Sequence, residues 1–182
     1  MKQKAIEFLL PEIFRRTVRP GEPLAGLLRT MEDLHEPSTE ILGRFDAYLD
    51  PYRTPDAFVP YLARWLDLER LFDDPNDDYT APEAGRNPIS SGLGRLRELI
   101  AWAAALSQRR GTRQGLLKFL EVATGLSGFG IDEDVKDPDG RALPFHIRVR
   151  LPKAARIHRS LIERIILLEK PAYVTYDLDF GS

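Results

Sequence analysis

Cysteine is missing from this 182-residue sequence, and histidine, methionine and tryptophan occur only three, two and two times. Without cysteine there can be no disulfide, no thiolate nucleophile and no zinc site built on sulfur, which fits assembly in a reducing cytoplasm. No apolar run approaches the roughly 20 residues that a transmembrane helix needs, so we expect no membrane-spanning segment. Hydrophobic residues make up 43% and charged residues 30%, which is typical of a globular protein.

A strong excess of positive charge is also lacking. The net charge is −2, which argues against a general nucleic-acid binder. The charge is unevenly distributed, because residues 1–92 carry 11 basic and 17 acidic groups whereas residues 93–182 carry 15 and 11. This asymmetry favours pairing between the two halves of the chain over head-to-tail pairing with neighbouring chains.

Residue types that carry chemistry are present without the spacing that the chemistry needs. The three histidines, His35, His146 and His158, have no partner at the spacing of a metal site or a catalytic triad. The acids Asp132 to Asp134 are more simply read as charges on an exposed strand edge than as a pair of catalytic carboxylates. We therefore predict no catalytic residue and a function other than catalysis.

Metal and cofactor motifs are equally absent. The acids between Asp73 and Asp78, and the pair Asp137 and Asp139, lack the spacing of the twelve-residue calcium loop. The glycines between Gly125 and Gly130 follow a predicted helix and lead towards a strand, which reverses the order of a dinucleotide-binding motif. We expect no bound metal and no cofactor.

The first residues of the chain predict helices. A short helix over residues 5–16 is interrupted by Pro11. From Leu24 to Leu49 the apolar residues keep helical phase across Pro37, which favours one kinked helix. The alternative is a break at the residue before this proline, with a new helix starting near Ser38.

A further helix and a loop complete this part. Thr54 is expected to cap a helix that begins at Pro55, and Trp65 is expected to be a core anchor on its buried side. Residues 73–92 have no periodicity and many turn-forming residues, so they predict a long loop, a feature that is usually functional or disordered.

The stretch from Leu106 to Gly125 predicts two helices joined by a tight turn. Gly111 is placed to end the first helix in the left-handed conformation, Thr112 to cap the second, and Gly125 to end it. Trp102 and Phe119 lie beside the apolar stripes of the two helices and are expected to be core anchors.

The last third of the sequence changes period. Strands are predicted over residues 129–135, 145–151 and 174–180, and a helix over residues 157–168 precedes the last of them. The expected fold is α+β and predominantly α-helical. Its expected domains are a helical region over residues 1–125 and a small β-β-α-β module over residues 126–182.

Several of these stretches together resemble the phage tail protein I family. The resemblance rests on Arg-Arg-Gly-Thr-Arg-x-Gly-Leu at 109–116, followed by Phe-Leu and Thr-Gly, and on Leu10 to Phe14. It also includes Asp-Pro at 50–51, the segment from Thr54 to Leu66, and Lys-Pro-Ala at 170–172, so that it covers most of the chain in the right order.

The resemblance implies a structural function. Proteins of this family are baseplate wedge components of contractile phage tails, and related domains occur in tailocins and extracellular contractile injection systems. They associate through helical bundles around a central hub and couple the baseplate to sheath contraction. The expected partners are other baseplate wedge proteins, in a hetero-oligomer, with the hub and the sheath-initiating proteins as further candidates. Assembly is expected in the bacterial cytoplasm, and which of the three kinds of particle is involved stays open.

One cluster of side chains and one alternative function complete the predictions. Arg109, Arg110 and Arg113 crowd the predicted turn, where planar guanidinium groups suit carboxylates and carbonyls. Pairing within the chain and contact with a partner are both open for them. The alternative function is a small effector or toxin-like hydrolase with a site under the loop at residues 73–92.

Overall fold

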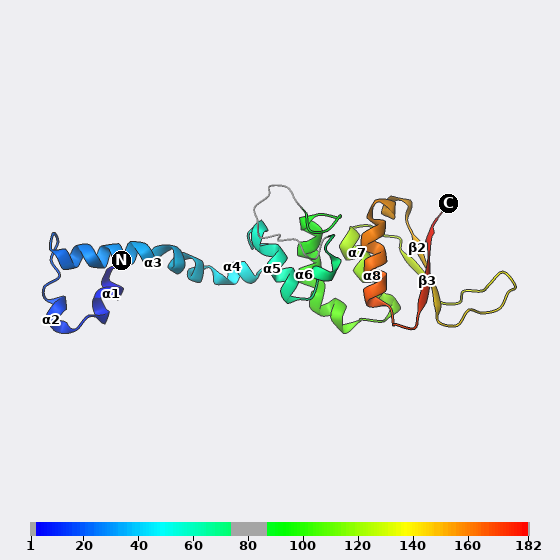
Figure 1. Cartoon of the computed structure of the whole chain (residues 1–182), viewed down its shortest axis with the longest axis horizontal. Helices are drawn as coiled ribbons and strands as arrows, with labels where there is room; N and C mark the ends of the chain where they lie inside the picture. Colours follow the sequence, from blue (N-terminus) through cyan, green and yellow to red (C-terminus); the bar gives the residue numbers. More distant parts are fainter. Residues whose placement is uncertain (1–2, 74–86, 182) are drawn as a thin grey trace. The chain divides into compact units, whose positions relative to one another are not determined.

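The structure is a computed structural model that describes residues 3–73 and 87–181, with side chains from Ile6 onwards. Contacts between Cα atoms divide the chain into two compact units, Met1–Ala47 and Tyr48–Ser182. The predicted fold class is confirmed: the described residues form eight α-helices and one small three-stranded sheet in a mostly helical α+β fold (Figure 1).

The first unit is helical. Its predicted first helix is two short ones on either side of Pro11, α1 (Gln3–Leu9) and α2 (Glu12–Arg15). The long helix α3 (Pro23–Gly43) then runs through Pro37 without a break, which confirms the continuous helix over the interrupted one. The helix ends earlier than predicted, with Arg44 as its C-cap, and α4 (Phe45–Leu49) follows as a separate short helix.

The helices of the second unit arise where apolar residues recur with helical spacing. They are η1 (Asp56–Phe58), α5 (Val59–Trp65), η2 (Glu69–Leu71), α6 (Leu93–Gln108), α7 (Arg113–Thr124), η3 (Lys153–His158) and α8 (Arg159–Glu169).

The sheet has the order β1-β2-β3. Its strands are β1 (Gly130–Asp132), β2 (His146–Leu151) and β3 (Thr175–Phe180). β1 and β2 are antiparallel, and a hairpin extending beyond the strands joins them (Figure 1). β2 and β3 are parallel, which requires a crossover, and η3 and α8 provide it.

One hydrophobic core joins helices and sheet in the second unit. α6, α7 and α8 bury their apolar stripes against one another and against Ile131, Val149 and Leu151 of the strands. The predicted boundary between residues 125 and 126 would cut through this core, and the division in the structure lies between Ala47 and Tyr48 instead. The physical reason is that α7 needs the sheet and α8 to cover its apolar face.

Candidate functional site

The turn between α6 and α7 begins from a left-handed glycine. Gly111 has φ +74°, and Thr112 is the N-cap of α7, where its hydroxyl accepts a hydrogen bond from the Gly115 amide at 3.0 Å. The same Thr112 hydroxyl donates to the Arg109 carbonyl at 2.7 Å. Gly125, with φ +72°, is the C-cap of α7. The Thr112 hydroxyl therefore bonds to the backbone on both sides of the turn, to Arg109 before it and to Gly115 after it.

Gly115 was not predicted as a special position, yet it has the closest packing of any described glycine in the turn. A Cβ atom at this position would lie 2.0 Å from the Arg109 carbonyl oxygen. Real Cβ atoms do not approach so closely, so this residue must be glycine for the turn to close. The only sequence signal is that a glycine stands inside the predicted helix, where it weakens the helix without another reason to be there.

The three arginines of the turn have different surroundings. Arg110 donates to the Leu168 carbonyl at 2.7 Å, and its Nε lies 3.7 Å from the Glu169 carboxylate, so it holds the end of α8. The side chains of Arg109 and Arg113 make no hydrogen bond or ion pair with residues 3–73 or 87–181. Arg110 thus has an internal partner, and the other two guanidinium groups are presented at the surface.

A small pocket of about 160 Å³ lies beside this turn. Its apolar walls include Leu116, Ile131 and Ile147, and Arg113 and Glu169 are among its charged lining residues. Burial raises the pKa of the Glu169 carboxyl above its ordinary value, and the nearby Arg110 opposes this effect without cancelling it. The pocket therefore combines an apolar interior with a carboxyl group that is poorly solvated.

The predicted tryptophan anchors are not in the core. Phe119 is buried, with 5% of its surface exposed, but Trp65 is 65% exposed and Trp102 is 38% exposed. After Trp65 the chain reverses at Asp67, which has φ +59°, and the Leu68 amide donates to the Ala63 carbonyl at 2.9 Å. This helix-ending motif turns Leu68 into the core in place of the tryptophan.

Both tryptophans instead contribute to surface features. The Trp65 ring packs edge-on against Phe58, with ring centroids 5.9 Å apart, and Phe58 also contacts Tyr48 and Tyr61. Trp102 lies under the Lys118 ammonium group, whose nitrogen is 4.6 Å from the ring centroid. Such a cation–π contact stabilises an aromatic ring that remains partly in water.

An extended row of exposed apolar side chains belongs to α3. Large side chains along this helix are exposed, and we call them the α3 stripe: Leu27, Met31, Leu34, Ile41 and Leu42. Leu28 is the only buried hydrophobic residue among the described side chains of this unit. From Leu24 to Ile41 the stripe and Ser38 follow one another at alternating steps of three and four residues, which is the spacing of a coiled-coil seam.

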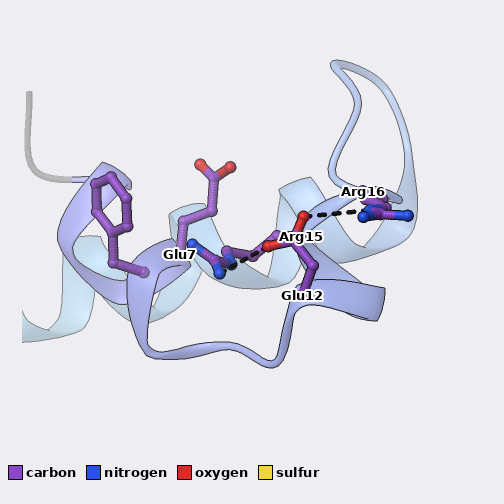
Figure 2. Close-up of a pocket in the computed structure, with 5 residues that line it drawn as sticks. Glu7, Glu12, Arg15 and Arg16 are labelled. Atoms are coloured by element: carbon purple, nitrogen blue, oxygen red, sulfur yellow. Dashed lines mark hydrogen bonds and ion pairs between the residues drawn. The ribbon is translucent and has the colours of Figure 1, made fainter.

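A second feature of the first unit is a pocket of about 330 Å³ around α1 and α2. Figure 2 shows the Glu12 carboxylate between Arg15 and Arg16, with Oε2 2.7 Å from Arg15 Nη2 and Oε1 3.1 Å from Arg16 Nε. Glu7 and Phe8 complete its lining. Among the described residues that line this pocket, both cations already pair with Glu12, so neither is free to bind an anion.

Two arginines that the sequence did not single out hold backbone segments in place. Arg97 of α6 donates to the carbonyls of Pro51 and Thr54. Arg164 of α8 donates to the Leu71 carbonyl at 2.7 Å and to the Phe72 carbonyl. The Thr54 hydroxyl is buried without a hydrogen-bond partner in the described residues, so Thr54 does not cap a helix as predicted. Its carbonyl, not its side chain, is what the fold uses.

The region of the alternative hydrolase site is only partly described, because residues 74–86 lie outside the described residues. On its described side, Ser90 Oγ is 3.4 Å from His158 Nδ1. Within the described chain His158 has no further hydrogen-bond partner, so no third group orients it as in a catalytic triad. The described side chains also contain no group of three or more histidine or acidic residues able to hold a metal ion.

In the residues that the structure describes, apolar and charged side chains are exposed and no catalytic constellation is assembled. The family model described as Phage tail protein (Tail_P2_I) matches residues 24–172. The chain therefore belongs to the phage tail protein I family, as the resemblance of its motifs predicted. No curated protein matches the sequence.

Family membership gives the protein a structural role in phage tails, in contact with other tail proteins. The match includes the α3 stripe, the α6–α7 turn and the first two strands of the sheet. In the described part of the chain, no helix has the length and apolar character required to cross a membrane.

Proposed function

We propose that the chain is a baseplate wedge subunit of a contractile tail-like particle. In this proposal it assembles with other wedge proteins around the hub and couples the baseplate to the sheath. Assembly takes place in the bacterial cytoplasm, and the chain then becomes part of a phage tail, a tailocin or an injection system. The observation that carries the proposal is the α3 stripe.

An exposed row of large apolar side chains is costly for a protein that acts alone. Full burial of a large apolar side chain contributes about 1.5–3 kcal/mol, and the stripe residues, which are partly to largely exposed, gain only part of this in the isolated chain. Its spacing matches the seam of a helical bundle, in which partner helices insert side chains between those of α3. A wedge partner that supplies such helices would bury the stripe.

The charge of this segment indicates the chemistry of that partner. Residues 23–50 contain two basic residues and six acidic ones. None of the acids occupies a position that directly flanks the seam, so they act through the overall negative charge of the segment, and complementary charge favours association. The bundle partner is therefore expected to be basic.

The surface arginines fit the same role. Arg109 and Arg113 have no partner in the described residues, and a neighbouring wedge chain can offer carboxylates or carbonyls to them. Arg110 has an internal function in the structure, because it holds the end of α8. We propose that Arg109 and Arg113 fix the orientation of the chain in the assembly.

The experiment is co-expression of the chain with each neighbouring tail gene, followed by purification of the complex. Leu34→Glu combined with Ile41→Glu places charges in the seam and should abolish the complex while leaving the melting of the second unit unchanged. Arg29→Glu introduces the same residue in α3 away from the seam and serves as the matched control. A wild-type chain that stays monomeric with all of these gene products, or a double variant that still forms the complex, contradicts the proposal.

A further inference from the structure

The sheet ends in an unpaired edge. β3 pairs with β2 along its full length of six residues, and among the residues that the structure describes no strand pairs with its other side. By contrast, the opposite edge strand, β1, has only three residues. A free edge of six residues presents a row of backbone donors and acceptors that can bind another strand.

The outer face of the sheet carries charges that alternate in sign from strand to strand. β2 presents His146, Arg148 and Arg150 on this face. Asp132 of β1 and Asp177 of β3 lie on either side of Arg148 in register. Two cross-strand contacts are formed, from Arg150 Nη2 to Asp132 Oδ1 at 2.8 Å and between His146 Nε2 and Asp177 Oδ2 at 3.1 Å.

The other face of β3 is incompletely covered. Tyr176, Leu178 and Phe180 point towards the core and pack against it, but each remains partly exposed. Arg156 of η3 lies over the Phe180 ring, 5.7 Å from its centroid. The edge strand thus has an apolar row on one face and, on the other, Asp177 and the exposed Asp179.

From these features we propose that the outer edge of β3 is a strand-addition site for an extended segment of a partner protein in which basic residues alternate with apolar ones. The incoming backbone continues the ladder of hydrogen bonds. Its basic residues lie beside Asp177 and Asp179, which extends the acidic–basic–acidic order of the sheet by one more basic strand. Its apolar residues cover the exposed parts of Tyr176, Leu178 and Phe180.

The same pattern rejects a second copy of this chain. In antiparallel pairing about Leu178, the residue opposite Asp177 is Asp179 of the other copy, and like charges directly opposite destabilise a strand pair. Shifting the register by one residue places aspartate beside leucine, so that charged and apolar side chains meet on both faces of the sheet. In-register parallel pairing places identical aspartates together. The edge therefore favours a basic strand over self-association.

The test uses the full-length chain and a labelled hexapeptide of alternating lysine and valine. Binding is measured by fluorescence anisotropy at low salt, and hydrogen exchange of the β3 amides is measured with and without peptide. We expect slower exchange in β3, and affinity at least about tenfold higher than for a glutamate–valine hexapeptide, because each opposite-charge pair is replaced by a like-charge pair. Weak binding of both peptides without protection of β3 would overturn the proposal.

Two controls separate strand addition from simple charge attraction. A lysine–valine peptide that is N-methylated at alternate residues keeps its charge but loses backbone donors, and it should bind at least about tenfold more weakly. Asp179→Lys leaves one acidic and one basic residue on this face of β3 and should abolish the preference between the two peptides, whereas Asp139→Lys makes the same charge change in the β1–β2 hairpin and should not. Asp179→Asn, which preserves side-chain shape, should weaken binding by a smaller factor.

Other results would contradict the inference directly. Equal binding of the methylated peptide, or equal effects of Asp179→Lys and Asp139→Lys, would show that only the overall charge matters. Protection of β3 in the absence of peptide, together with dimers in sedimentation, would show that a second copy occupies the edge. The melting temperature of each variant is compared with that of the wild type to exclude unfolding.

Discussion

Gly111 and Gly115 lie in the same turn and are glycine for different physical reasons. Gly111 needs a positive φ, and a Cβ atom added to it would meet no other atom within 4 Å, so its requirement is one of backbone conformation alone. Gly115 lies in helix α7, where its missing side chain leaves room for the Arg109 carbonyl. The sequence pattern reveals the first kind of glycine and hides the second.

Substitution by alanine separates the two. Gly111→Ala should destabilise the protein by about 1–2 kcal/mol, the usual cost of a left-handed conformation. Gly115→Ala should cost about 3 kcal/mol, because the turn must open to relieve the clash with the Arg109 carbonyl. Helix propensity alone predicts the opposite sign for Gly115→Ala, a gain of about 1 kcal/mol. Denaturant unfolding of both variants measures the difference, and a more stable Gly115→Ala variant would contradict the structure.

The contribution of Glu169 to folding stability depends on pH, because burial raises the pKa of its carboxyl. Because its pKa is raised in the folded state, chiefly by burial, its favourable contribution is fully present below the unfolded-state pKa. That contribution is lost as the pH rises through the folded-state pKa, where the carboxyl must ionise while poorly solvated. Glu169→Gln removes the ionisation, so its melting temperature relative to wild type should increase from about pH 4 to pH 8. A constant or decreasing difference over this range would show that Arg110 compensates fully for burial.

At the scale of the element, periodicity predicted most of what forms. The stripes of α6, α7 and α8, and the alternation in β2 and β3, all lie where the sequence indicated. Trp65 and Trp102 were misplaced because an apolar stripe does not reveal where a helix ends or which flank a neighbour covers. Arg97 and Arg164 could not be predicted either, since a single arginine gives no sequence signal for the carbonyls that it will meet in the fold.

The segment around residues 73–92 illustrates how the fold closes a long connection. The Asp73 amide donates to the Pro88 carbonyl at 2.8 Å, so a hydrogen bond joins the two segments on either side of residues 74–86. Arg164 fixes this point further through the Leu71 and Phe72 carbonyls and through Asp73 Oδ1 at 2.8 Å. The stability of the second unit should therefore depend on these contacts of Asp73 and Arg164.

Shortening the chain between residues 73 and 87 and removing Arg164 should have opposite effects on stability. Replacing residues 74–86 by about four glycine and serine residues should change stability by no more than about 1 kcal/mol, in the stabilising direction, because loop entropy depends weakly on length. Arg164→Ala removes charged hydrogen bonds to backbone carbonyls and should cost about 1.5–3 kcal/mol. Thermal melting of both variants tests this expectation. Unfolding of the shortened chain with a stable Arg164→Ala variant would assign the support to residues 74–86 instead.

At the scale of the whole molecule, the buried apolar residues are distributed very unequally. The second unit contains the shared core of α5 to α8 and the sheet, whereas the described part of Met1–Ala47 buries Leu28 alone among its hydrophobic residues. Stability of a unit follows from the apolar surface it buries. The second unit thus has the means to fold on its own, and the first has an extended helix whose apolar surface faces solvent.

Separate fragments should show this difference. Residues 48–182 should unfold cooperatively within about 3 °C of the full-length chain, since the shared core is intact. Residues 1–47 should be largely unfolded alone, because isolated helices are marginal in water and Pro37 removes a hydrogen bond from the middle of α3. Mixed with a wedge partner that supplies a basic amphipathic helix, the same fragment should gain helical circular dichroism, and Leu34→Glu with Ile41→Glu should prevent the gain. A 1–47 fragment that is fully helical without a partner would show that the α3 stripe is satisfied by α1 and α2 within the unit, and the stripe would no longer support the wedge assignment.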